Sequence, residues 1–153
     1  MDGFELAEDD PWVGYARLTV AIRWTDLADL TVRPAPCGRV GPWPWPAADP
    51  VAVLTAWNPG GTQAAPELNR KRQAELEEEL RPLAAEMWSA TGKDPVTGRG
   101  DEGVAVRGVP ESSVLRVAAS YGQDAVFVWT PAEWAIVACT GGRRMASGWQ
   151  LVP

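Results

Sequence analysis

The chain has 153 residues, of which 46% are hydrophobic and 22% charged, and its formal net charge is −6. This length suits one compact domain, because two domains of half the size would each bury too little surface. The composition excludes wholesale disorder, and no apolar run reaches the roughly eighteen residues that a membrane helix needs. The first twenty residues also lack the basic start and apolar core of a secretory signal, so we expect a cytoplasmic protein without membrane contact.

The negative charge is concentrated at the N-terminus. Five acids and no bases occur in the first ten residues, namely Asp2, Glu5, Glu8, Asp9 and Asp10. Setting these five aside, fifteen of the twenty acids remain against fourteen bases, so the rest of the chain is nearly neutral. We therefore predict a flexible acidic tail over residues 1–10 and a single domain over residues 11–153. A nearly neutral domain also argues against an extended nucleic-acid surface, because binding a polyanion needs clustered Lys and Arg.

Histidine is absent from the sequence. Its absence removes the commonest general base and excludes a Ser-His-Asp or Cys-His mechanism within this chain. The two cysteines, Cys37 and Cys139, form no Cys-x-x-Cys pair and are too few for a disulfide scaffold. The sequence therefore predicts no metal site and no cofactor, and it favours a reducing cytoplasm.

The first predicted elements are a strand and a proline-rich loop. Residues 17–24 alternate in hydropathy, which places Leu18, Val20, Ile22 and Trp24 on one face of a strand. Residues 33–50 contain six prolines and are predicted to form an extended loop. Two tryptophans of this loop, Trp43 and Trp45, leave two alternatives open. Either they fold over the edge of the sheet as a lid, or they form an exposed surface for a partner.

A buried strand and a long helix follow. Residues 51–57 are almost wholly apolar, which is typical of a strand buried on both faces, and the strand stops at Asn58-Pro59-Gly60-Gly61. Pro66 suits the first turn of a helix. The stripe of Leu76, Leu80, Leu83 and Met87 predicts a helix that Pro82 either kinks or divides and that Gly92 can end.

The remaining elements complete an α+β pattern. After a polar loop over residues 91–103 we expect a short strand at 104–107 and a second helix from Pro110 to Gly122. Strands at 125–129 and 134–139 form a hairpin, and residues 149–152 add a last short strand. The predicted fold is a single mixed β-sheet of about five strands with two helices packed on one face.

The loop after the second strand is the best local candidate for a site. Asn58 precedes a proline and is expected to be extended, while Gly60 and Gly61 permit close backbone approach. The following helix carries Arg70, Lys71 and Arg72, so its start is a candidate anion site. The alternative is an ordinary turn beside a solvated basic face. Either Asp101 or Glu102, which precede the short strand, is placed to face this loop.

Three groups of residues resemble a known family. Over residues 51–130 the sequence resembles the bacterial domain-of-unknown-function family 3293. The similar motifs are Thr55-Ala56-Trp57-Asn58-Pro59, Asn69 with Arg72 and Gln73, and residues 121–125. Glu102 occupies the position of an acid of that family, although Gly100 replaces the family's tryptophan. The resemblance implies that five polar residues converge, either as a ligand site or as a buried hydrogen-bond network: Asn58, Asn69, Arg72, Glu102 and Gln123.

These features lead to two functional hypotheses. The first is a binding or accessory protein that recognises a small anionic ligand or a protein partner. The alternative is an enzyme acting on a nucleotide or another phosphorylated small molecule, with Glu102 as acid/base and Arg72 as a clamp. The candidate ligand-binding residues are Asn58, Gly60, Gly61, Asn69, Arg72, Glu102 and Gln123.

Overall fold

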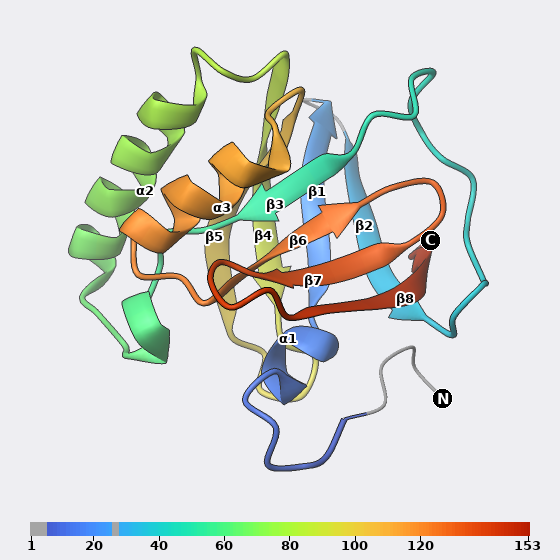
Figure 1. The fold of residues 1–153 in the computed structure, drawn as a ribbon, viewed down its shortest axis with the longest axis horizontal. Coiled ribbons are helices and arrows are strands. Elements are labelled where there is room, and N and C mark those ends of the chain that lie inside the picture. The colour runs from blue at the N-terminus through green and yellow to red at the C-terminus, as the bar shows by residue number, and fades with distance from the viewer. Residues whose placement is uncertain (1–5, 26–27) are drawn as a thin grey trace.

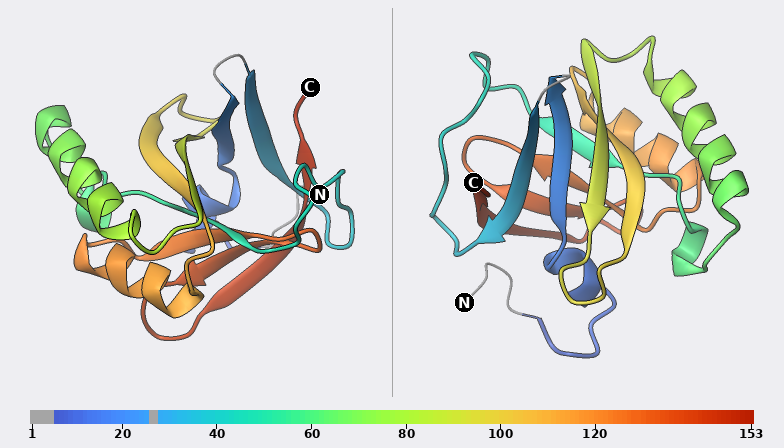
Figure 2. Two further views of the ribbon diagram at one scale, coloured as in Figure 1. Left: turned by 90° about the horizontal axis from the view of Figure 1, so that it is seen from above. Right: turned by 180° about the vertical axis from the view of Figure 1, so that it is seen from behind.

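The computed structural model describes residues 6–25 and 28–153, and within them eight antiparallel strands form a closed barrel (Figure 1). The strands are β1 (Thr19–Thr25), β2 (Ala28–Ala35), β3 (Val51–Leu54), β4 (Glu86–Lys93), β5 (Gly100–Arg107), β6 (Ala125–Trp129), β7 (Trp134–Ala138) and β8 (Arg144–Leu151). Their order around the barrel is β1-β2-β8-β7-β6-β3-β5-β4, and pairing of β4 with β1 closes it. Figure 2 shows β2, β1, β4 and β5 side by side on the wall behind the view of Figure 1.

The predicted single mixed sheet of about five strands is therefore wrong. Two of the additional strands gave weak local signals. The sequence of β4 was assigned to the end of a helix and to a loop, yet β4 pairs with β5 from Glu86 to Lys93. Strand β2 contains Pro34, which cannot donate to a ladder, yet it pairs with β8. Strands β5 and β8 also begin earlier than expected, at Gly100 and Arg144.

The strand predictions based on strong alternation or on a continuous apolar run are confirmed. In β1, Val20 and Ile22 are fully buried in the barrel interior. All four residues of β3 are buried, because one face lines the barrel and the other lies beneath helices. The hairpin of β6 and β7 also forms, with Ala125 paired to Ala138 and Trp129 to Trp134.

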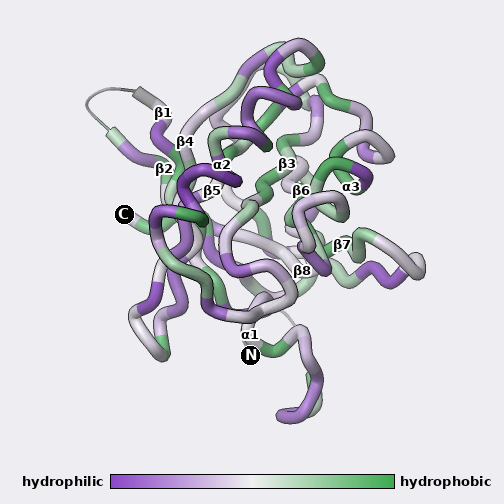
Figure 3. The backbone as a smooth tube through the Cα atoms, turned by 90° about the vertical axis from the view of Figure 1, so that its left-hand side faces the viewer, coloured by the Kyte–Doolittle hydropathy of each residue, from purple (hydrophilic) through white to green (hydrophobic). Residues whose placement is uncertain are grey.

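Two helices, α2 (Pro66–Leu80) and α3 (Glu111–Ser120), cover one side of the barrel (Figure 1). Their apolar faces share a core with the outward faces of β3, β5, β6 and β7, and Figure 3 shows that α2 is mostly hydrophilic along the rest of its length. The helix α2 ends at Leu80, and Pro82 lacks the N–H that would continue its hydrogen-bond pattern. Met87 belongs to β4, so the predicted continuation to Gly92 is wrong. Among the described residues, no helix is both long and apolar enough to cross a membrane.

Tryptophans fill one end of the barrel. Trp24 near the end of β1, Trp88 near the start of β4 and Trp129 at the end of β6 lie at this end. The proline-rich loop adds Trp43 and Trp45, whose rings lie 4.9 and 5.2 Å from that of Trp129. Trp45 is only 5% exposed, and the indole of Trp43 donates a hydrogen bond to the Ala47 carbonyl at 2.8 Å. The lid interpretation is thus confirmed, with the end of a barrel in place of a sheet edge.

The N-terminal segment crosses the other end of the barrel through the short helix α1 (Val13–Ala16) (Figure 1). An ion pair flanks the helix on each side. Asp10 binds Arg143 at 2.7 Å, and Arg17 binds Asp94 at 2.8 Å. Asp10, which the sequence placed in the flexible tail, therefore has a defined partner, whereas Asp2 and Glu5 lie outside the described residues.

Candidate functional site

A cavity of about 480 Å³ occupies the end of the barrel beneath α1. Three inward positions at this end carry small side chains, Ala90 and Gly92 in β4 and Ala125 in β6, whereas the opposite end carries tryptophans. The register places Gly92 directly opposite Asp101 in β5, so the side chain of Asp101 lies on the same inner face. The glycine thereby leaves room beside a carboxylate.

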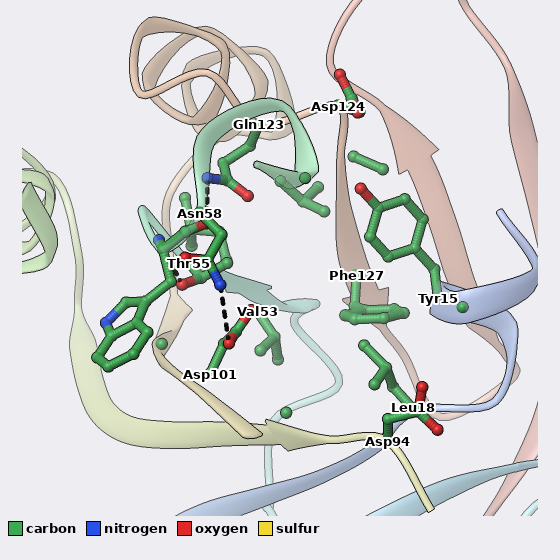
Figure 4. A pocket seen from close by; sticks show the side chains of 18 of the residues that line it. Tyr15, Leu18, Val53, Thr55, Asn58, Asp94, Asp101, Gln123, Asp124 and Phe127 are labelled. Atoms are coloured by element: carbon green, nitrogen blue, oxygen red, sulfur yellow. Dashed lines mark hydrogen bonds between the residues drawn. The ribbon is translucent and has the colours of Figure 1, made fainter. Parts of the chain in front are cut away.

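Figure 4 shows that the two sides of the cavity differ in chemistry. On one side, Tyr15 from α1 and Phe127 from β6 present aromatic rings. On the other side, Asn58 and Asp101 present an amide and a carboxylate. Gln123, which follows α3, lies beside Asn58 on this polar side. The cavity therefore combines apolar walls with a few convergent polar groups, the usual composition of a small-molecule site.

Asn58 adopts a left-handed backbone conformation, with φ 48° and ψ 62°. The extended geometry expected of a residue before proline is thus wrong here, because side-chain hydrogen bonds outweigh that preference. Its Oδ1 accepts from the Ala64 amide at 3.0 Å and from Asn69 Nδ2 at 2.9 Å. In return, Asn69 Oδ1 accepts from the Asn58 amide at 3.0 Å. These three bonds fix the loop and leave Asn58 Nδ2 to face Asp101.

Gln123 connects the end of α3 to the same loop. Its Nε2 donates to the Trp57 carbonyl at 3.0 Å and faces that of Tyr121 at 3.5 Å, which leaves Oε1 for the cavity. The preceding Gly122 has φ 75°, as a glycine that ends a helix commonly does, and its carbonyl accepts from the Gly60 amide at 2.8 Å. A Cβ at Gly122 would lie 2.7 Å from Cβ of Pro59, so glycine is also needed for this close approach.

The ionisable groups of the cavity are electrostatically coupled. Burial raises the pKa of Asp101, and the nearby charge of Arg99 opposes that rise only in part. Burial likewise raises the pKa of Tyr15, to which the charges of Asp124, Cys139 and Asp101 contribute. Asn58 Nδ2 donates to Asp101 Oδ1 at 3.5 Å. This long hydrogen bond only weakly compensates the hydration that the carboxylate loses on burial. The lining contains three Asp and two Arg side chains, so its formal net charge is −1 at neutral pH.

The structure brings together some of the candidate residues. Asn58, Gly60, Gly61 and Gln123 line the cavity. Asn69 is 1% exposed and lies behind Asn58 in the hydrogen-bond network, where it supports the loop without lining the cavity.

The other two candidates, Arg72 and Glu102, do not line the cavity. Glu102 is exposed, because neighbouring residues of a strand point to opposite faces and Asp101 takes the inner one. The backbone carbonyl of Glu102 accepts from Thr55 Oγ1 at 2.5 Å, so this residue has a structural role. The convergence of five polar residues implied by the resemblance is therefore only partial.

Sequence reasoning missed Tyr15, Asp124 and Phe127, and it left the choice between Asp101 and Glu102 open. Alternation within β5 could have identified Asp101. Val104 and Val106 face the helices, so Ala105, Gly103 and Asp101 share the inner face. No local pattern marked Tyr15, because its position depends on α1 crossing the barrel end.

Five amides of the loop at the predicted anion site already have acceptors within the protein. The amides of Asn58, Gly60, Gly61, Thr62 and Ala64 each donate to an acceptor within the protein. Within residues 6–25 and 28–153, no group of three or more Cys, Asp or Glu side chains is arranged to hold a metal ion.

The chain matches one family model. Residues 54–126 match a family described as a protein of unknown function (DUF3293), which confirms the resemblance seen in the sequence. The matched segment runs from the end of β3 into β6 and includes Asn58, Asp101 and Gln123, whereas Tyr15 lies outside it. No curated protein matches the chain. The family description states no activity, so the geometry of the cavity carries the functional argument.

Proposed function

We propose that this protein binds a small organic molecule in the cavity beneath α1. One observation carries the proposal: tryptophans fill one end of a closed barrel, and small inward residues leave about 480 Å³ at the other. Small-molecule sites typically enclose about 300–1,000 Å³ and combine apolar walls with a few polar groups. An eight-stranded barrel can hold one small ligand in this way.

The polar groups of this cavity are held in place before any ligand binds. Asp101 projects from a strand that is paired on both sides, and Asn58 and Gln123 are fixed by the hydrogen bonds described above. Phe127 stacks on Trp134 with ring centroids 4.9 Å apart. Such preorganisation supports binding, because little side-chain freedom is lost when the ligand enters.

The other functional hypotheses receive less support from this geometry. An anionic ligand would meet the carboxylates of Asp101 and Asp124 in the cavity. An enzyme that used Glu102 and Arg72 together would need both at one cavity, and neither lines this one. A protein partner and a cytoplasmic location stay predictions from the sequence.

A fragment screen by NMR tests the proposed function. Small aromatic and aliphatic fragments are added to the ¹⁵N-labelled full chain. We expect some of them to shift the backbone amides of Gly92, Asp101 and Ala125, which line the cavity. The indole resonances of Trp129 and Trp149, at the filled end, should stay unchanged.

A pair of leucine substitutions on one strand provides the control. A Cβ at Gly92 would meet only Leu18 Cδ1, at 3.8 Å, so Gly92→Leu places its side chain in the cavity. Thr91→Leu adds a leucine to the exposed outer face of the same strand. We expect Gly92→Leu to abolish the shifts and Thr91→Leu to preserve them. If no fragment shifts the cavity amides of the unmodified protein, the proposed function is wrong.

A further inference from the structure

Two polar side chains of the lining, Asp101 and Gln123, leave hydrogen-bond acceptors open to the cavity. Gln123 uses its donor on the Trp57 carbonyl and keeps Oε1 for the cavity. Asn58 uses its acceptor on Ala64 and Asn69, and its donor faces Oδ1 of Asp101. Oδ2 of Asp101 then has no donor within the described part of the chain. A ligand that complements these atoms must supply donors.

The charges around the cavity favour the same kind of ligand. Five ionisable Asp and Arg residues line it, and the pair of Arg17 and Asp94 is mutually neutralised at 2.8 Å. The remaining charges are Asp101 and Asp124 against the single Arg99. Asp101 is half-buried and receives one long hydrogen bond. A buried carboxylate needs closer hydrogen bonds or a paired positive charge to offset its loss of hydration.

The opposite wall can accommodate a cation as well. Tyr15 and Phe127 present aromatic rings across the cavity from Asp101 (Figure 4). The faces of such rings attract positive charge, and the phenol oxygen of Tyr15 can accept a further hydrogen bond. The apolar side chain of Val53, also in the lining, offers a surface to the hydrocarbon part of a ligand.

From these observations we infer that the ligand is a small organic cation, a primary ammonium or an amidinium attached to an apolar body. Its nitrogen donates to Asp101 and to Oε1 of Gln123, and its body packs between Phe127 and Val53. This inference rests on the proposed binding of a small molecule in the cavity and adds the chemical class of that molecule.

Three aromatic probes of similar size test the charge. Benzylammonium, benzyl alcohol and benzoate share a ring and differ in their polar group. Each is titrated into the labelled protein at pH 7 and low salt, with the amides of Gly92 and Ala125 as readout. We expect benzylammonium to bind at least about tenfold more tightly than benzoate, since charge-assisted hydrogen bonds discriminate by that much or more.

Two variants identify the carboxylate responsible. Asp101→Asn keeps the shape and removes the charge, so the affinity for benzylammonium should fall about tenfold, while that for benzyl alcohol stays within about twofold. Glu102→Gln removes the adjacent charge on the outer face of β5 and should change neither affinity. The melting temperature of each variant shows that it is folded.

Each outcome distinguishes the cation inference from the proposed function. Equal binding of the three probes, or tighter binding of benzoate, overturns the cation inference and leaves binding in the cavity intact. Failure of all three probes while other fragments shift the cavity amides also overturns the inference alone. If no fragment of any kind shifts these amides, both proposals fail together.

Discussion

Asn58 combines a backbone conformation and a hydrogen-bonding role that few residues can provide together. Asparagine enters the left-handed region more readily than other residues with a Cβ, and at φ 48° it is the one such non-glycine residue in the described part of the chain. Its side chain then satisfies the Ala64 amide and Asn69. We therefore regard Asn58 as the residue that sets the rim of the cavity.

Substitution of Asn58 separates these two roles. Asn58→Ala should lower the free energy of unfolding by about 1–3 kcal/mol, because partly buried donors lose their acceptor. Asn58→Gly loses the same bonds but adopts a positive φ freely, so it should be more stable than Asn58→Ala, by about 1 kcal/mol. Urea denaturation measures both values. Equal stability of the two variants would show that the backbone conformation costs nothing.

Asp101 should destabilise the folded protein at neutral pH. Burial raises its pKa above the ordinary value of 3.8, so the folded state holds the proton more tightly than the unfolded state does. Stability then falls as pH rises through the interval between the unfolded and the folded pKa. Replacing Asp101 alone leaves the other polar groups that face the cavity in place, so the pH dependence that is lost belongs to Asp101. These groups are Tyr15, Asp124, Arg99 and Asn58.

We therefore expect Asp101→Asn to melt at a higher temperature than the unmodified protein at pH 7. The difference should shrink as the pH is lowered and disappear below 3.8, where Asp101 is protonated in both states. Thermal unfolding followed by circular dichroism at several pH values measures it. A variant that melts at a lower temperature at pH 7 would contradict the burial cost assigned to this carboxylate.

At the scale of elements, the proline-rich loop acts as part of the core although it forms neither helix nor strand. Prolines keep the segment extended, and its two tryptophans pack against rings contributed by β1, β4 and β6. The rings meet mostly edge to face, an arrangement favoured for aromatic pairs. This end of the barrel is thus closed by a loop.

Trp45→Ala should lower the free energy of unfolding by about 3–5 kcal/mol, the usual cost of removing a buried large aromatic side chain. Trp43→Ala should cost less, because Trp43 is only partly buried. Chemical denaturation of the two variants gives the comparison.

Quenching by iodide tests the same packing with a readout other than stability. Replacing both Trp43 and Trp45 by Phe removes one buried and one partly buried emitter, and the remaining tryptophans are likewise buried or partly buried, so the quenching slope should stay nearly unchanged. A smaller slope in the variant would mean that the two tryptophans are exposed, as expected of a partner-binding surface.

At the scale of the whole molecule, the ion pair of Asp10 and Arg143 joins the N-terminal segment to the start of the last strand. Arg143 also lies 4.1 Å above the ring of Trp12, which is 6% exposed. The hydrogen bonds from Arg143 lower the pKa of Asp10, with help from the Trp12 amide. The stability that this carboxylate contributes is therefore present above its unfolded pKa and is lost as pH falls through its folded pKa.

Asp10→Asn should accordingly lower the melting temperature at pH 7, and the effect should vanish in acid. Asp9→Asn is the matched control, since Asp9 is exposed on the same segment, and it should leave the melting temperature unchanged. Equal effects of the two substitutions would contradict the docking of Asp10. Docking of Asp10 would place the end of the acidic tail predicted over residues 1–10 before Asp10.

The sequence alone determined those elements whose signal is local. Alternation in β1, the continuous apolar run of β3, the hairpin of β6 and β7 and the helix-ending Gly122 all follow from interactions between neighbours in the chain. The loop of Asn58 was likewise evident from nearby residues, and the family resemblance singled out Gln123, which lines the cavity.

Only the tertiary structure decided that the strands close into a barrel and where the cavity lies. Strand β4 places small residues, Ala90 and Gly92, on its inner face, so its hydrophobic alternation is too weak to detect in the sequence. Because successive side chains of a strand point to opposite faces, Asp101 points into the barrel and Glu102 points outward. The negative character of the cavity arises only when α1, β5 and the end of α3 meet around it, because these segments are far apart in the chain.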